Sequence, residues 1–400
     1  MPRFYHVIIF IFFVILTTAC TPQPEEIAVP TAAASDDFTF GLILVGPSND
    51  HGWSEAHYNG GLYIEQNMPN SKMLLSENLN PNARPEATLQ GEVKKMIDNG
   101  AQLIFITSDD FSAETLIVAR KYSQIYFVHI SGDHALQGAS PVNLSNYMGK
   151  MIYGKMIAGC AAALATENNA IGYVGPLINS ETLRLANASY LGAKYCFDNY
   201  RDTEAESLRF RVEWIGFWFH VPGVTADPTE ITNSLLDDGF DVILSGIDTI
   251  EPSTTTAERA AQGENVYTVP YDYENACQSV NEICLGVPYY NWGPGYLQFA
   301  EAVSYHAWKH TWVWAEPDWA DLNNPDTSPV GFATGAALTP EQQEQLDQFI
   351  AGLGNGSINL FRGPLNLQDG SIYLRAGETA SDEQIWNMPQ LLKGMEGLSE

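Results

Sequence analysis

The chain has 400 residues, long enough for two domains of ordinary size that each bury a core. Its apolar content of 45% and charged content of 17% are typical of a folded globular protein and argue against a disordered chain. The formal net charge of −29 argues against binding to nucleic-acid phosphates or anionic lipid headgroups through a basic surface, so no nucleic-acid partner is expected.

The N-terminus has the pattern of an export signal. An apolar stretch from Val7 to Leu16 follows a positively charged start and is too short to span a bilayer comfortably. Small residues then precede Cys20, as in a bacterial lipoprotein signal, although Thr17 stands where Leu is usual. We expect a signal peptide over residues 1–19, lipidation of Cys20 and a flexible tether over residues 20–37. A plain secretory signal is the alternative.

The remaining cysteines form an even set, as expected in an oxidising compartment: Cys160, Cys196, Cys277 and Cys284. The last two bracket a short acidic loop, and the first two lie on successive helix-like segments, so each pair could form a disulfide. Four cysteines allow three pairings, and the sequence does not choose among them. None of the spacings is typical of a zinc site, so no metal is expected.

Short apolar runs alternate with helix-like segments in the first part of the chain. Strands are expected over residues 38–45, 72–76, 101–107 and 126–130, and helices over 56–68, 85–99 and 113–122. This βαβα order predicts a parallel, doubly wound sheet.

A second series of the same kind follows. Strands are expected over 171–174, 210–217, 241–245 and 266–269, and helices over 147–165, 181–200, 228–237 and 251–261. The 147–165 helix is rich in Gly and Ala, which suits close packing. Two series predict two similar lobes with a cleft between them. The C-terminal part shows helix-like segments over 296–308 and 340–353 and a hairpin pattern over 359–370.

The first candidate site lies at residues 46–55, Gly-Pro-Ser-Asn-Asp-His-Gly-Trp-Ser-Glu, between the first strand and the first helix. In open α/β sheets the strand's carboxyl end and the following helix N-terminus form the rim of the ligand crevice. Asp50 can accept from the polar edge of a ring there, and Trp53 offers a flat face for stacking. The alternative is an Asn-Asp turn with the Trp packed on the domain surface.

Other strand ends carry further polar and aromatic residues: Ser108, Asp109, Trp218, Asp248, Asp272 and Trp292. Taken alone, a Trp or Asp after a strand is more often a packing or capping residue. Together, aromatic rings and carboxylates at one cleft suit a flat, neutral heterocycle with N–H donors, such as a purine. The sequence has no Gly-x-Ser-x-Gly elbow, metal-spaced His pair or phosphate loop, so neither catalysis nor a cofactor is expected.

Several motifs resemble the basic membrane protein family, the substrate-binding lipoproteins of ABC transporters for purine nucleosides. They include Asn-Asp-His-Gly-Trp at 49–53, Ile-Phe-Ile-Thr-Ser at 104–108, Ile-Gly-Tyr-Val-Gly at 171–175 and Asn-Trp-Gly-Pro at 291–294. The resemblance covers nearly the whole mature chain. The His-Gly-Trp and Trp-Gly-Pro forms are similar to the branch that contains adenine-binding members and the Med-like regulators.

The resemblance implies an α/β chain with a type I periplasmic-binding-protein fold, in which two Rossmann-like lobes with parallel sheets are joined by a hinge. Lobe one is expected over 38–135 plus 292–318, and lobe two over 136–291 plus 319–400. The protein is expected to be a monomer, lipid-anchored on the extracytoplasmic face of the membrane. There it would bind a purine base or nucleoside and deliver it to an ABC permease.

The resemblance also implies a set of ligand-binding residues: Asp50, His51, Gly52, Trp53, Ser108, Asp109, Trp218, Asp248, Asp272 and Trp292. By motif, Trp53 stacks the base, Asp50 and Ser108 meet the base or a ribose from lobe one, and Asp248 and Asp272 bind from lobe two. The other two Trp residues close the pocket near the hinge. Asp109 stands in a stretch that is more aromatic in the family, so it adds an acid to the expected site.

The ligand and the role stay open at this point. Residues 177–184 lack the family's Pro pair and 247–252 match its Thr-Asp-Ser-Pro form only in part, so base and nucleoside are both retained. A surface sensor that signals to a partner is an alternative to transport. A hydrolase of the same ligand is a further alternative.

Overall fold

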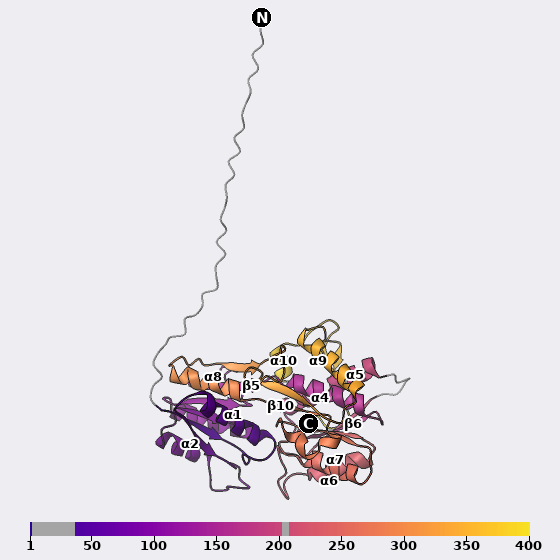
Figure 1. Ribbon diagram of the computed structural model, residues 1–400. Helices are drawn as coiled ribbons and strands as arrows, with labels where there is room; N and C mark the ends of the chain where they lie inside the picture. Colours follow the sequence, from indigo (N-terminus) through magenta and orange to yellow (C-terminus); the bar gives the residue numbers. More distant parts are fainter. Residues whose placement is uncertain (2–36, 202–207) are drawn as a thin grey trace. The chain divides into compact units, whose positions relative to one another are not determined.

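The computed structural model describes Met1, residues 37–201 and residues 208–400 (Figure 1). The expected signal peptide, the lipidation site Cys20 and residues 20–36 of the tether lie outside the described residues. Ser35–Glu400 is one compact unit, called the body below. Among the described helices, none combines the length and the apolar character needed to cross a bilayer.

Lobe one is built on a sheet of six parallel strands. Their order is β11-β5-β4-β3-β1-β2. The strands are β1 (Phe38–Ile43), β2 (Ser71–Ser76), β3 (Leu103–Ile106), β4 (Tyr126–Ile130), β5 (Leu144–Gly149) and β11 (Trp312–Ala315). Its helices are α1 (Trp53–Asn67), α2 (Leu89–Asp98), α3 (Ser112–Lys121) and α8 (Gly293–Ser304), with a 3-10 turn η1 (Asp109–Phe111). β3 is buried along its whole length, as a run of Leu, Ile and Phe inside a covered parallel sheet should be.

Lobe two is built on a sheet of four parallel strands in the order β7-β6-β8-β9. The strands are β6 (Ala170–Gly175), β7 (Arg209–Trp214), β8 (Val242–Ser245) and β9 (Tyr267–Val269). Its helices are α4 (Met151–Ala165), α5 (Ser180–Tyr200), α6 (Pro228–Asp237) and α7 (Glu251–Ala261). In both sheets each strand leads into a loop or helix at its carboxyl end, so loops from both lobes can meet at one cleft.

The chain passes between the two sheets after β5, after β10 (Gly286–Tyr290) and after β11. β10 pairs antiparallel with β12 (Val330–Thr334). The C-terminal part adds α9 (Pro340–Gly354), the small hairpin β13 (Leu365–Asn366) with β14 (Ile372–Leu374), and α10 (Asp382–Trp386). These features confirm the α/β fold with two lobes and parallel sheets. The hairpin expected over 359–370 forms later in the chain, between β13 and β14.

The segment after residue 135 differs from the sequence expectation. A single helix was expected over 147–165, with lobe one's first segment ending at 135. Instead β5 pairs with β4 and with β11, and the helix begins only at Met151. β5 is buried at every position, so the pattern of a covered strand was hidden at the start of an apolar helix. The sheet of lobe one therefore extends to Gly149.

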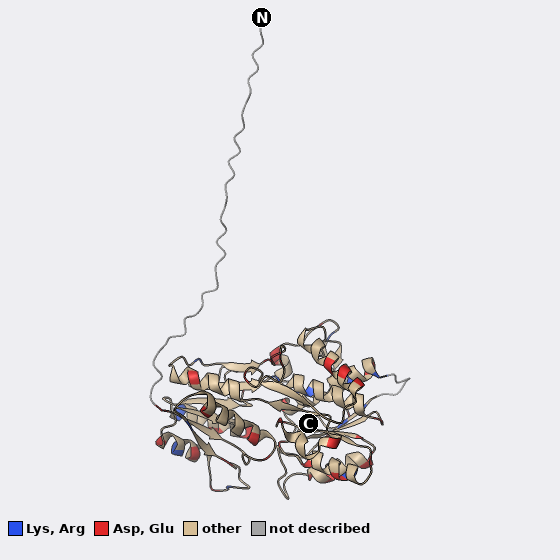
Figure 2. Cartoon of the chain, viewed as in Figure 1, with Lys and Arg blue, Asp and Glu red and all other residues tan. Residues whose placement is uncertain are grey.

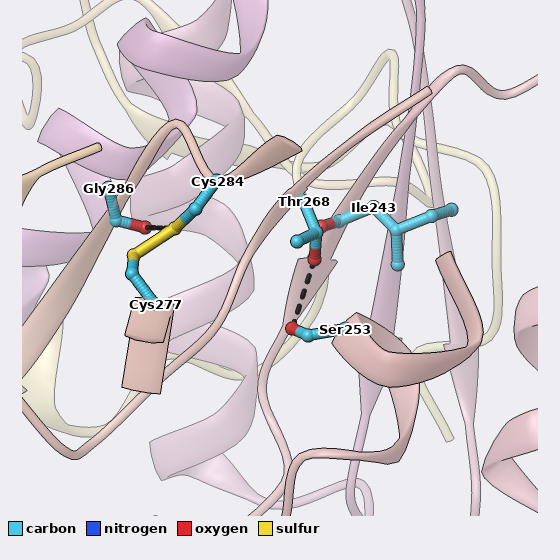
Figure 3. Close-up of a disulfide and its surroundings, with 6 residues drawn as sticks. All are labelled: Ile243, Ser253, Thr268, Cys277, Cys284 and Gly286. Carbon is cyan, nitrogen blue, oxygen red and sulfur yellow. Dashed lines mark hydrogen bonds between the residues drawn. A yellow bond between two sulfur atoms is a disulfide. The ribbon is translucent and has the colours of Figure 1, made fainter. Parts of the chain in front are cut away.

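Both disulfides that the sequence allowed between neighbouring cysteines are formed. Cys160–Cys196 joins α4 to α5. These helices pack closely, because a Cβ on Gly159 would lie 1.9 Å from the Ser189 carbonyl oxygen. Cys277–Cys284 closes the loop that follows β9 (Figure 3).

Candidate ligand-binding site

A cavity with about 290 Å³ of empty space lies between the two lobes at the carboxyl ends of their strands. It is lined by Trp53, Ser108, Asp109, Ser131, Glu181, Trp218, Asp248 and Tyr271. These residues follow β1, β3 and β4 in lobe one and β6, β7, β8 and β9 in lobe two. The position is the one expected for a ligand in a parallel α/β protein. Half of the ten expected site residues line this cavity, and the other five lie around it.

Trp53 is the first residue of α1 and presents its indole to the cavity. Its Nε1 donates a hydrogen bond to the Thr107 carbonyl oxygen at 2.7 Å. The ring meets His57 edge to face at 4.4 Å and Trp292 at 5.5 Å between ring centroids. The side chain is only 6% exposed. The hydrogen bond and the packing together fix the plane of the indole, which is what a stacking surface for a flat ligand requires.

Trp292 supports this surface and does not line the cavity. It is stacked between Tyr290, at 4.4 Å, and His57, at 4.3 Å. His57 Nδ1 lies 2.6 Å from the Tyr296 hydroxyl, and burial lowers the pKa of His57 well below its usual value. The ring is therefore neutral, and the group forms an aromatic layer behind Trp53.

Asp109 bonds to two residues of the opposite lobe. Its Oδ1 accepts from Trp218 Nε1 at 2.8 Å and its Oδ2 accepts from Asn179 Nδ2 at 3.3 Å. Burial raises the pKa of Asp109 to about 7, and the charges of Glu181 and Asp110 act in the same direction. Both oxygens of this carboxyl group thus have partners within the protein.

Asp248 and Asp272 form an acidic pair at the lobe-two side. Burial raises the pKa of each well above its usual value, and the charge of Asp272 adds to the effect on Asp248. Asp248 lines the cavity, whereas Asp272 is 0% exposed and is not one of the lining residues. Neither oxygen of Asp272 has a hydrogen-bond partner of good geometry among the described residues. Asp248 is therefore the better placed of the two to meet a ligand.

Lys155 of α4 is the buried cation beside this pair. Its Nζ donates to the Ser245 carbonyl oxygen at 2.7 Å and lies 3.2 Å from the ring centroid of Tyr271. Burial lowers the pKa of Lys155 to about 7, while the charge of Asp272 opposes that shift. The charge of Asp272 thus favours the protonated form of Lys155, whereas burial favours the neutral form.

Glu181 of α5 is balanced in a similar way. Its Oε2 lies 3.6 Å from Arg184 Nη2, and both side chains are nearly buried. Burial raises the pKa of Glu181, and Arg184 and the hydroxyl of Ser131 lower it. Ser131 belongs to lobe one, so this contact also crosses the cleft.

The three residues before Trp53 lie at the edge of the site. The Asp50 carboxylate accepts from the backbone N–H groups of Gly52 at 3.0 Å, Ser54 at 2.9 Å and Glu55 at 2.9 Å, and so caps α1. His51 is exposed and lies 3.1 Å from Glu55. Gly52 lies against lobe two, because a Cβ there would be 1.8 Å from the Asp248 carbonyl oxygen.

Three residues of the site were not singled out from the sequence: Ser131, Glu181 and Lys155. Ser131 follows a predicted strand, so the strand-end rule could have found it. Glu181 and Lys155 lie within helices. Nothing in their local sequence distinguishes them from surface residues, since their burial depends on how α4 and α5 pack.

The cavity is acidic and aromatic. Its lining includes three carboxyl groups, two indoles and one phenol, and no Lys or Arg. Acidic residues are also spread over the helices of the body (Figure 2), in keeping with 48 Asp and Glu against 19 Lys and Arg. Within residues 37–201 and 208–400, no group of His, Cys, Asp or Glu is arranged to hold a metal ion.

Two parallel-sheet lobes with a cavity at their facing strand ends define a solute-binding protein of the periplasmic-binding-protein type. The model of the family described as ABC transporter substrate-binding protein PnrA-like (Bmp) matches residues 38–283. The chain belongs to this family, which confirms the resemblance seen in the motifs. Proteins of this family act outside the cytoplasm and bind small solutes for ABC transporters.

Two relatives and one solved structure agree with this assignment. A purine-binding protein of Brucella abortus is 25% identical over 91% of this chain and 95% of its own length. A Haloferax volcanii protein named for a proposed glucose-binding role in an ABC transporter is 26% identical over 89% of this chain and 79% of its own length. The structure of an ABC transporter solute-binding protein from Aeropyrum pernix has a TM-score of 0.62 at 13% identity, covering 80% of this chain and 92% of that one.

Proposed function

We propose that this protein is the lipid-anchored solute receptor of an ABC importer, which binds a purine base or nucleoside between its lobes and delivers it to the permease. The observation that carries the proposal is the cavity at the facing strand ends, where two indoles and three carboxyl groups surround one small space. The protein's part is binding and release, without chemistry on the ligand.

The lining suits a flat heterocycle with N–H donors. A ring stacked on Trp53 gains roughly 1 to 3 kcal/mol, the usual contribution of a base on an aromatic side chain. Its N–H groups can donate to Asp248 and to the hydroxyl of Ser108. Buried carboxyl groups without such donors are unfavourable when ionised, so a ligand that supplies donors relieves that penalty.

The charge of the cavity narrows the ligand class. With three acids and no cation in the lining, a phosphorylated nucleotide would meet repulsion.

A sugar is the second candidate ligand, because the Haloferax relative is named for glucose. An indole can also cover the apolar face of a sugar. A thermal-shift screen of the full chain with adenine, guanine, their nucleosides, AMP and glucose separates the candidates, since a ligand that binds only the folded state raises the melting temperature. We expect a shift with a purine base or nucleoside. A shift with glucose and with no purine would overturn the proposal.

A further inference from the structure

The contacts of Asp109 cross the cleft in two places. Asp109 begins η1 after β3 of lobe one, whereas Asn179 caps α5 and Trp218 follows β7 of lobe two. The hydrogen bonds to Trp218 Nε1, at 2.8 Å, and to Asn179 Nδ2, at 3.3 Å, use both oxygens of the carboxyl group. One side chain of lobe one therefore holds two separate loops of lobe two.

Trp218 is itself part of the cavity wall. It lines the cavity and is 8% exposed. Its indole N–H can donate only one hydrogen bond, and that bond goes to Asp109. The ring can therefore stack against a ligand, but its polar edge is not free to recognise one. The orientation of the Trp218 ring in lobe two therefore depends on Asp109 of lobe one.

We propose that Asp109 is a positioning residue that ties Trp218 and Asn179 to lobe one in the closed form, and that it retains the ligand by slowing reopening of the cleft rather than by binding the ligand. This inference rests on the proposed function, because it concerns the release of the same solute. It reassigns Asp109, which the sequence placed among the ligand-binding residues.

The charges around Asp109 give the proposal a pH dependence. Glu181, with Arg184 beside it, faces Asp109 from α5, Asp248 faces it from the loop after β8, and Asp110 follows it in η1. In the closed form, burial and these acids raise the pKa of Asp109 to about 7. When the cleft opens, water restores a value near the usual 3.9 or so. The closed form therefore binds more protons between these values, and lowering the pH favours closure.

The direction of the pH effect distinguishes two roles for Asp109, binding the ligand and holding the lobes together. If its ionised carboxylate accepted from the ligand, affinity would fall as the pH drops through about 7. If it acts by holding the lobes together, ligand release should become slower as the pH drops from about 8 to about 5.5, and Asp109→Asn should remove that part of the dependence. The Asn variant keeps an oxygen that can accept from Trp218 while lacking the ionisable group.

The experiment measures adenine dissociation from the full chain by stopped flow. At about pH 5.5, where the carboxyl group is protonated in the closed form, we expect Asp109→Ala to release adenine about 10- to 100-fold faster, the effect of one or two hydrogen bonds, with little change in the association rate. Trp218→Phe, which keeps a ring and removes the N–H, should have a similar effect. Asp110→Ala is the matched control, since it removes the neighbouring acid, whose side chain makes no hydrogen bond to lobe two among the described residues.

The double variant Asp109→Ala/Trp218→Phe tests whether these two residues act through the same contact. If the two residues act through one contact, its dissociation rate should fall short of the product of the single effects by about threefold or more. Full additivity, or a wild-type dissociation rate in Asp109→Ala, overturns the inference. If the wild type binds neither purines nor glucose, the proposed function fails. The inference is then tested by small-angle scattering without ligand: the wild type should become more compact at low pH and Asp109→Asn should not, and equal behaviour of the two overturns it.

Discussion

The contact between Gly52 and lobe two predicts a variant that blocks closure without harming either lobe. A Cβ at position 52 would lie 1.8 Å from the Asp248 carbonyl oxygen and 2.8 Å from its carbonyl carbon, and its next neighbour is the Thr249 nitrogen. All three atoms belong to lobe two. The backbone of Gly52 has a negative φ of −148° with a ψ of −132°. Every atom that the added methyl group would meet lies across the cleft, so its steric effect falls on the contact between the lobes.

The size of the effect follows from the overlap. Ordinary contact needs roughly 3.5 Å, so the lobes must stay apart by about 1.5 Å or shift sideways. Overpacking of this kind costs about 1 to 3 kcal/mol when it cannot be relieved, which is about 5- to 150-fold in affinity. Opening of the cleft relieves the overlap in the free protein. We therefore expect weaker adenine binding in calorimetry and an unchanged melting temperature without ligand.

Gly91→Ala is a suitable control for this variant. Gly91 lies in α2 of the same lobe, and the nearest atom to a Cβ there is Thr88 Oγ1, within lobe one, at 3.1 Å. It should bind adenine like the wild type. If Gly52→Ala also binds with wild-type affinity and compacts normally with ligand in small-angle scattering, the lobes do not close as the structure shows them.

Three further predictions concern the site and the scaffold. Trp53→Ala should weaken adenine binding by roughly 1 to 3 kcal/mol in calorimetry, and unchanged affinity in a folded variant would reduce this ring to packing. Folding raises the pKa of Asp109 to about 7, so its contribution to stability is full below the unfolded value near 3.9 and is lost as the pH rises to about 7, by at most about 1.4 kcal/mol per pH unit. In chemical denaturation, the unfolding free energy of Asp109→Asn should therefore depend less on pH than that of the wild type. The same pH dependence in both proteins would mean that this group is not buried. Replacing Cys160 and Cys196 by Ala should cost about 2 to 5 kcal/mol of unfolding free energy, and no loss would show that the bond between α4 and α5 does not form in solution.

The sequence predicted the fold because the strand and helix periods are strong in both lobes. It failed at β5, where a buried strand runs almost directly into an apolar helix and only Gly149 and Lys150 mark the boundary. The strand-end rule located the cavity, since Trp53, Asp109 and Asp248 all follow strands and meet there.

The rule could not assign a role to each carboxylate. Asp50, Asp109 and Asp272 occupy similar positions in the sequence, yet one caps a helix, one bonds to the other lobe and one faces a buried Lys155. Each role is set by a partner that the fold brings from elsewhere, and that partner leaves no mark in the local sequence. Glu181 and Lys155 were not predicted from the sequence for the same reason.

The central claim, that the cavity binds a purine, is tested most directly by isothermal titration calorimetry of the full chain with adenine, adenosine and glucose on one preparation. The account predicts saturable binding of adenine or adenosine at one site per chain and no heat from glucose. Saturable binding of glucose with none of either purine would contradict it.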